Sequence, residues 1–229
     1  MRFLWVVAGV LVLDQVTKLI VRLNMDMGHI GAIDLIGDWL KFTYTENPGM
    51  AFGINFGPPG LITGFSIIAA AMIAIYLLRI RKCYMPYTVS LACILGGATG
   101  NIIDRLFYGM IFDYGPFFQG RVVDFIHFDI WYGRLPSSIP FIGDTYLSFF
   151  PIFNVADIGI VGGVIGILLF QQKFLNRLHG EQEAGALDLP TEVATSAPVQ
   201  EKQIPLSDQN PSGEGSLNSS SGERCPFLK

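Results

Sequence analysis

Four apolar stretches alternate with more polar connections along the chain, at residues 3–23, 60–80, 87–107 and 152–170. Each has about 20 residues, the length that crosses a hydrocarbon layer of about 30 Å as a helix. The first follows Arg2 as a signal peptide would, but no small-residue cleavage site comes after it and apolar residues resume beyond Asp14. We therefore interpret it as a retained span. The pattern predicts a mainly α-helical membrane protein with four transmembrane helices.

The two long connections, residues 24–59 and 108–151, have a different pattern. In residues 33–56, apolar and polar side chains alternate around aromatic residues, with glycines between them, which is typical of short strands. The second connection is rich in Phe, Tyr, Trp, Gly and Pro, and Trp and Tyr favour the lipid–water interface. We expect these connections to form a small extracytoplasmic platform of β-sheet and loops at the membrane surface.

Basic residues predict the orientation, because they favour the cytoplasmic side of short loops. They lie before the first span, between the second and third, and after the fourth: Arg2, Arg79, Arg81, Lys82, Lys173 and Arg177. Three arginines oppose this reading: Arg22, Arg121 and Arg134. On balance both termini should be cytoplasmic and both long connections outside.

Composition supports the membrane assignment and separates a tail from the rest. The 229 residues are 51% hydrophobic and 15% charged, whereas soluble proteins carry about 25% charged residues. Residues 180–229 hold eight acidic and three basic side chains, which leaves eleven and twelve for residues 1–179. Since the tail is rich in Glu, Ser, Pro and Gly, we expect a disordered cytoplasmic tail after a transmembrane unit of residues 1–179.

The composition also argues against several partners. No basic stripe or cluster indicates nucleic acid. The three cysteines and three histidines are scattered along the chain, whereas a metal site needs clustered ligands. We therefore predict neither a metal nor a cofactor.

Polar side chains lie inside the predicted spans, where an ionised group costs at least about 2.5–3.5 kcal/mol by insertion scales. Asp14 and Lys18 lie on one face of the first span at i, i+4 spacing. The third span ends in an Asn and an Asp at i, i+3 spacing followed by an Arg, and the fourth opens with a second such pair. These residues are Asn101, Asp104, Arg105, Asn154 and Asp157. In each i, i+3 pair the amide and the acid should share a face.

The acids converge toward the outer surface. Asp157 lies about five residues inside its span, roughly 8 Å deep by helical rise, and Asp124 interrupts a short apolar run in the outer connection. Ion pairing would explain Asp14 with Lys18, and Asp104 beside Arg105, without any catalytic role. Because no adjacent base neutralises Asp124 or Asp157, these two acids are the functional candidates.

Five blocks of this sequence resemble, in the same order, the signature blocks of lipoprotein signal peptidase (signal peptidase II). They are DQVTK at 14–18, ENPGMAFG at 46–53, GGATGNIIDR at 96–105, VVDF at 122–125 and FNVAD at 153–157. The resemblance covers about residues 3–175. Residues 127–151 form a longer segment than in typical members, which predicts an aromatic insertion over the site, and Pro48 and Met50 depart from the family's small residues.

The resemblance implies an aspartic endopeptidase of the bacterial inner membrane, with its site near the outer leaflet. Its partners would be membrane lipid and prolipoproteins, cut on the N-terminal side of a diacylglyceryl-modified cysteine. It implies that Asp124 and Asp157 are catalytic and that Asp14 and Lys18 are structural. It implies substrate binding or support of the catalytic pair for Asn47, Gly97, Asn101, Asp104, Arg105, Asn154 and Ala156.

The implied chemistry is physically consistent. Two neighbouring carboxylates share one proton, so one can activate water while the other hydrogen-bonds the carbonyl oxygen. At this point either acid could carry that proton.

Other classes of protein remain as alternatives. A proton or cation transporter could use Asp14, Asp104 and Asp157 as a relay, but it predicts acids near the midplane and often internal repeats. A presenilin-like protease needs a Gly-x-Gly-Asp signature, and Asp144 lacks its first glycine. A non-catalytic scaffold would tolerate asparagine at both Asp124 and Asp157.

Overall fold

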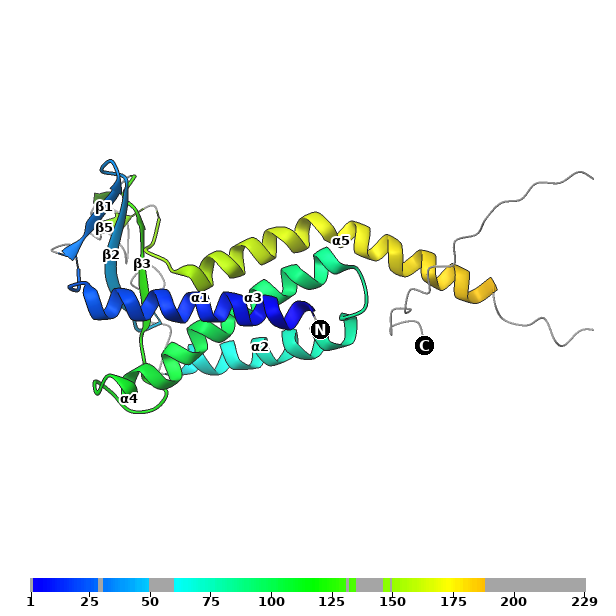
Figure 1. The fold of residues 1–229 in the computed structure, drawn as a ribbon, viewed down its shortest axis with the longest axis horizontal. Helices are drawn as coiled ribbons and strands as arrows, with labels where there is room; N and C mark the ends of the chain where they lie inside the picture. The colour runs from blue at the N-terminus through cyan, green and yellow to red at the C-terminus, as the bar shows by residue number, and fades with distance from the viewer. Residues whose placement is uncertain are drawn as a thin grey trace, which may run out of the picture.

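The computed structural model describes residues 2–28, 31–49, 60–130, 132–134, 146–148 and 150–187. Four long helices run along the molecule and a small sheet lies across one end of them (Figure 1). The helices are α1 (Arg2–Asn24), α2 (Leu61–Ile80), α3 (Met85–Ile103) and α5 (Val155–Leu187). A π-helical turn, η2 (Asp104–Tyr108), and the short α4 (Gly109–Ile111) continue α3 toward the sheet.

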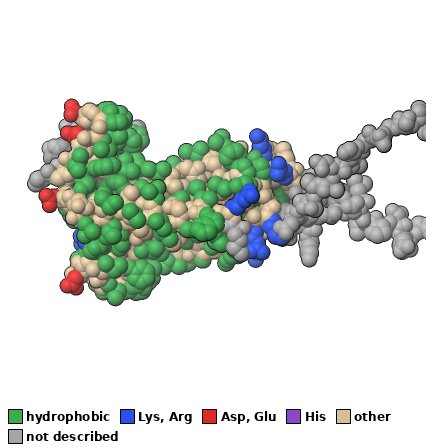
Figure 2. Space-filling view, viewed as in Figure 1, with side chains coloured by type: hydrophobic (Ala, Val, Ile, Leu, Met, Phe, Trp, Pro, Cys, Tyr) green, Lys and Arg blue, Asp and Glu red, His purple; other side chains and the backbone are tan. Residues whose placement is uncertain are grey.

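Helix α3 is the centre of the bundle. It contacts α1, α2 and α5, and a larger share of its apolar stretch is buried than in the other three helices, 56% against 17% for α1 and 11% for α2 and α5. The other three helices expose large apolar side chains such as Trp5, Phe65 and Leu169, and the bundle surface is largely hydrophobic (Figure 2). All four helices are long and apolar enough to cross a membrane. The prediction of four transmembrane helices is therefore confirmed.

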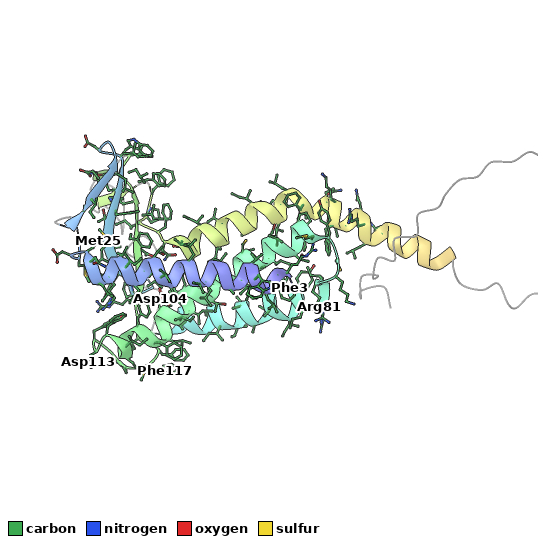
Figure 3. The ribbon with its side chains drawn as sticks, viewed as in Figure 1. Phe3, Met25, Arg81, Asp104, Asp113 and Phe117 are labelled. Atoms are coloured by element: carbon green, nitrogen blue, oxygen red, sulfur yellow. The ribbon has the colours of Figure 1, made fainter. Side chains whose placement is uncertain are left out.

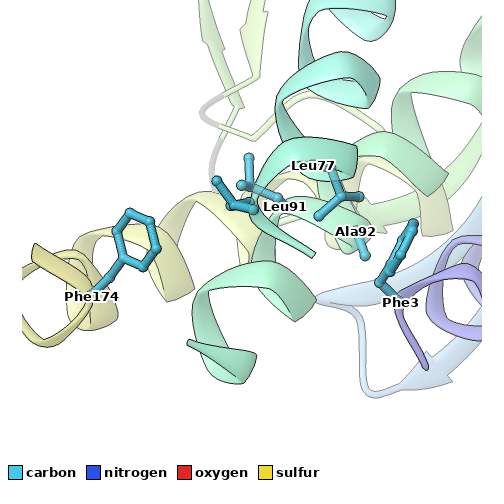
Figure 4. Packing of buried hydrophobic residues seen from close by; sticks show 6 residues of the cluster. Phe3, Leu77, Leu91, Ala92 and Phe174 are labelled. Atoms are coloured by element: carbon cyan, nitrogen blue, oxygen red, sulfur yellow. The ribbon is translucent and has the colours of Figure 1, made fainter. Parts of the chain in front are cut away.

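An apolar cluster closes the end of the bundle that lies away from the sheet. Phe3, Leu77, Leu91, Ala92 and Phe174 pack there, so that each of the four helices contributes a side chain (Figure 4). The Tyr87 ring stacks on Phe174 with 4.3 Å between ring centroids. These contacts hold α5 against α3 at the end where basic side chains gather (Figure 2).

The sheet joins the two long connections. Strands β1 (Ile33–Ile36), β2 (Leu40–Asn47) and β3 (Val122–Phe128) form an antiparallel sheet in that order. The short strands β4 (Tyr132–Arg134) and β5 (Tyr146–Ser148) pair separately within the longer segment. The predicted small sheet in these connections is confirmed, and the structure adds the pairing of β2 with β3 across them. Residues 50–59 and 135–145, including Met50, lie outside the described residues, so an insertion over the site stays a prediction.

The helix boundaries differ from the predicted spans at α5. The helix starts at Val155, because Phe153 pairs with Ile126 of β3 as an isolated antiparallel bridge. It continues to Leu187, so residues 180–187, which the sequence analysis placed in the tail, are helical. The remainder of the predicted tail, residues 188–229, lies outside the described residues.

Candidate active site

A buried ionic cluster lies between α1 and the end of α3. The Lys18 ammonium is 2.8 Å from Asp14 and 2.7 Å from Asp104, and all three side chains are fully buried. Asp104 lies in the half of the bundle next to the sheet (Figure 3). The expected Asp14–Lys18 contact is present, but the suggested pairing of Asp104 with Arg105 is wrong. Lys18 is the partner of Asp104 because α1 packs against α3 at this level.

Two polar side chains that the sequence analysis did not select, Gln15 and Tyr108, extend this cluster. Gln15 donates its amide to Asp104 across 2.8 Å, and the Tyr108 hydroxyl donates to Gln15 across 3.3 Å. The backbone N–H of Ala156 donates to Asp14 across 2.9 Å. Gln15 follows Asp14 inside the first signature block, and Tyr108 lies four residues, about one helical turn, after Asp104. This closeness in sequence to a buried acid is the signal that could have identified both residues.

Two asparagines connect this cluster to the candidate catalytic acids. Lys18 donates to the Asn101 side-chain oxygen across 2.8 Å, and the Asn101 amide donates to Asp157 Oδ1 across 3.0 Å. Because an ammonium can only donate, its contact determines which end of the Asn101 amide faces Asp157. Asn154 donates to the same Asn101 oxygen across 3.3 Å.

Asn154 lies between the two acids. Its side-chain amide donates to Asp124 across 2.6 Å, and its side-chain oxygen accepts the backbone N–H of Asp157 across 3.0 Å. In return the backbone N–H of Asn154 donates to Asp157 Oδ2 across 3.2 Å. This reciprocal arrangement is a capping box. Asn154 therefore precedes α5 as its cap rather than lying within the helix, although its side chain still faces Asp157 as predicted.

Asp124 lies in the middle of β3 and is 4% exposed. Burial raises the pKa of this carboxyl from 3.8 to about 7, and the charge of Asp157 acts in the same direction. Hydrogen bonds from Asn154 and Asn47, and the charge of Lys18, oppose this shift. Asp124 is thus an acid whose proton is exchangeable near neutral pH, the property that acid–base catalysis needs.

Arg105 lies in the π-helical turn η2, a type of helix distortion that is frequent at functional sites. It is within electrostatic reach of Asp104, Asp124 and Asp157. Its Nε atom is buried, and no acceptor among the described residues hydrogen-bonds it. This donor is therefore available to a group that enters the site.

Small residues allow the helices to approach closely enough for these contacts. A Cβ atom on Gly97 would collide with the Ala156 carbonyl oxygen, and one on Gly100 would collide with Asp14. Gly97 and Ala156 therefore determine how near α3 and α5 lie, one helical turn from Asn101. The structure brings all eleven residues selected from the sequence into one region formed by α1, β2, α3, η2, β3 and α5.

Comparisons with known proteins agree with this arrangement. A family model described as signal peptidase (SPase) II matches residues 6–173. The lipoprotein signal peptidase of Amoebophilus asiaticus is 40% identical over 197 residues, covering 80% of this chain and 83% of that protein. That of Porphyromonas gingivalis is 37% identical over 188 residues, covering 73% and 81%.

Two solved structures of bacterial membrane enzymes share the fold. One superposes with a TM-score of 0.52 at 29% identity, covering 73% of this chain and 90% of that one. The other gives 0.54 at 27% identity, covering 84% and 94%. The match to a peptidase family argues against the alternatives of a transporter and of a non-catalytic scaffold. The chain belongs to the signal peptidase II family, the lipoprotein signal peptidases, and is a membrane-bound peptidase.

Proposed function

We propose that this protein is an aspartic endopeptidase that cuts prolipoproteins on the N-terminal side of a diacylglyceryl-modified cysteine. The observation that carries the proposal is a pair of acids, the buried Asp124 and the partly buried Asp157, which the Asn154 side chain connects by bonding the Asp124 carboxyl and the backbone N–H of Asp157. Two acids held together in this way can share one proton, because two adjacent negative charges are unfavourable in a dry site. They can act as base and acid toward a water and an amide.

We assign the proton to Asp124 and the negative charge to Asp157. Asp157 accepts the Asn101 amide and the backbone N–H of Asn154, and it lies in the first turn of α5, where the helix dipole favours a negative charge. Asp124 is the acid whose pKa burial raises to about 7. Lys18, through Asn101, keeps an amide donor directed at Asp157.

The reaction then follows from these protonation states. Asp157 takes a proton from water as the water oxygen attacks the carbonyl carbon, and Asp124 donates its proton to the carbonyl oxygen. When the tetrahedral intermediate collapses, that proton returns to Asp124, and Asp157 gives its proton to the leaving nitrogen as the C–N bond breaks. Arg105 would hold the substrate, with its buried Nε donating to a substrate carbonyl, and Asn47 would support the pair through its hydrogen bond to Asp124.

We place the site near the outer leaflet of the bacterial inner membrane, with both termini in the cytoplasm. Two observations support this orientation. Basic side chains gather at the end of the bundle away from the sheet, and acidic side chains lie at the end that carries the sheet (Figure 2). Arg22, which opposed the assignment, forms an ion pair with Glu46 and so is not a free positive charge.

The test is cleavage of a synthetic diacylglyceryl-modified prolipoprotein by the purified full chain in detergent, with product masses measured. We expect Asp124→Asn and Asp157→Asn each to lower the rate by about 10²- to 10⁴-fold, the size of an acid–base contribution. Asp38→Asn, the same change at an exposed position in the β1–β2 turn, should cleave normally. Near-normal cleavage by either folded active-site variant, or a cut at another bond, would overturn the proposal.

A further inference from the structure

A second ionic cluster lies on the face of β2 that points away from Asp124. Arg22, near the end of α1, forms an ion pair with Glu46 and donates to the Tyr44 hydroxyl across 2.9 Å. The Tyr44 hydroxyl in turn donates to Glu46 across 2.7 Å. The Arg22 and Glu46 side chains are only 14% and 5% exposed. These three residues are here called the Arg22 clamp.

Aromatic rings enclose the clamp. The Arg22 guanidinium carbon lies 3.9 Å from the centroid of the Phe112 ring and 5.2 Å from that of Tyr114. A buried ion pair is costly to form unless its geometry is well satisfied. None of the proposed chemistry uses this pair, so its presence beside the site needs another reason.

The register of the sheet connects the clamp to the catalytic acid. Thr45 lies opposite Asp124, Glu46 opposite Val123 and Asn47 opposite Val122. Because strand side chains alternate, Glu46 points to the clamp while Thr45 and Asn47 point to the face of Asp124. Asn47, one residue beyond Glu46, hydrogen-bonds Asp124. The clamp therefore fastens β2 to α1 directly beside the residue that contacts the acid.

Helix α1 then supports the acid pair from two sides. Asp14, Lys18 and Arg22 follow one another at four-residue intervals, which places them along one stripe of the helix. Lys18 acts on the α3 side through Asn101, and Arg22 acts on the β2 side through Glu46. One rigid helix thus sets the relative positions of the groups that bond Asp157 and Asp124.

We propose that the Arg22 clamp is a positioning element that holds Asn47 against Asp124 during catalysis. This inference rests on the proposed function. Its consequence is that breaking the clamp weakens one hydrogen bond to Asp124 without touching either acid. The other charged groups that act on Asp124 are Asp157 of α5, Lys18 of α1 and Arg105 of η2, and they are left in place.

The test compares pH profiles of kcat and kcat/KM for the full chain in detergent. Asn47 lowers the pKa of Asp124, so its release moves the loss of activity at high pH to a higher pH. We expect Arg22→Gln and Glu46→Gln to lower kcat by about 10- to 100-fold, as small displacements at active sites do. Both should also move the high-pH limb, the part of the profile where activity is lost as the pH rises, to a higher pH. Asn47→Ala should move it in the same direction.

Three further variants separate positioning from folding. Tyr44→Phe removes only a hydroxyl and should produce a smaller shift of the same sign. The double variant Arg22→Leu/Glu46→Leu removes both charges of the ion pair and leaves neither buried without a partner, so it should fold. Its high-pH limb should still lie at a higher pH than that of the wild type. Arg121→Gln is the matched control, because Arg121 is 3.6 Å from Glu46 but half-exposed, and such pairs contribute little.

The outcomes are distinct. Folded clamp variants whose high-pH limb stays at the wild-type position, whatever their rate, would overturn the positioning role. Recovery of the wild-type profile by the double leucine variant would also overturn it, since only the unpaired charge would then matter. Failure of the proposed function itself would appear separately, as cleavage by Asp124→Asn.

Discussion

Asn154 donates its side-chain amide to Asp124 across 2.6 Å, and this bond joins the start of α5 to the middle of β3. The same side chain caps α5 through the backbone N–H of Asp157. One residue therefore performs two separable tasks: it begins the helix that carries one acid and it orients the other acid.

The two tasks of Asn154 can be separated by substitution. Serine is also a good helix cap but lacks the amide donor, so Asn154→Ser should keep the thermal stability while cleavage falls. Asn154→Ala should lose both, with the free energy of unfolding lowered by about 1 kcal/mol, the usual value of a cap. Thermal unfolding and cleavage rates of both variants check this. Equal stability losses for Ser and Ala would contradict the capping role.

The pH dependence of activity follows from Asp124. In the proposed mechanism its carboxyl must be protonated to donate to the carbonyl oxygen, and its pKa is raised to about 7. We therefore expect kcat/KM to fall as the pH rises above about 7, with a slope approaching tenfold per pH unit. A profile that stays level to pH 9 would show that Asp124 is not the proton donor.

The same raised pKa makes Asp124 a source of instability at neutral pH. A folded-state pKa above the unfolded value of about 3.9 means that the stability contribution is present at low pH and is lost as pH rises toward about 7. Asp124→Asn has no carboxyl to ionise at this position, so it does not lose stability in this way as the pH rises. Its free energy of unfolding should exceed that of the wild type by a margin that grows from pH 4 to pH 7, up to about 4 kcal/mol. A margin that does not depend on pH would contradict the assignment.

Lys18 is the shared counter-charge of two buried acids. Lys18→Met leaves Asp14 and Asp104 without the ammonium that both contact. We expect the free energy of unfolding to fall by about 3–5 kcal/mol, the cost of breaking a buried pair from one side. Lys41→Met is the matched control, because Lys41 pairs with Asp129 in a more solvated place and should matter much less. Chemical unfolding in detergent measures both.

Gly97 tests the close approach of α3 and α5. A methyl group there would collide with the Ala156 carbonyl oxygen, so Gly97→Ala should separate the helices and lengthen the Asn101–Asp157 hydrogen bond. We expect about 10²-fold slower cleavage, since misplacement by about 1 Å can cost that much. Gly64→Ala is the control, because no atom of the described residues outside its own turn of α2 lies within 4 Å of the added methyl. Equal rates for both variants would contradict the packing argument.

The local features of the site could be predicted from spacing alone. Four-residue and three-residue intervals put Asp14 with Lys18 and Asn154 with Asp157, and the structure has both contacts. These predictions work because helical periodicity depends only on neighbouring residues. The same spacing could not show that Asn154 lies outside the helix, since its cap position depends on the bridge between Phe153 and Ile126.

Long-range partners required the folded structure. Lys18 and Asn101 are 83 residues apart, Gln15 and Asp104 are 89 apart, and nothing in either segment alone names the other. The adjacent Arg105 was the natural candidate to pair with Asp104, yet a buried lysine from another helix takes that place. Arg22 was counted only as a charge opposing the topology, because its partner Glu46 lies on a strand of the next connection.

The sequence by itself determined the four spans, because the length of an apolar run decides whether a helix can cross a bilayer. It also determined which polar residues share a face, and five ordered blocks identified the family. Tertiary structure decided which faces meet. Close packing at Gly97 and Gly100 and the pairing of β2 with β3 bring α1, α3, α5 and the sheet together. Only that packing buries Asp124 and raises the pKa of its carboxyl to about 7, the value on which its proposed role depends.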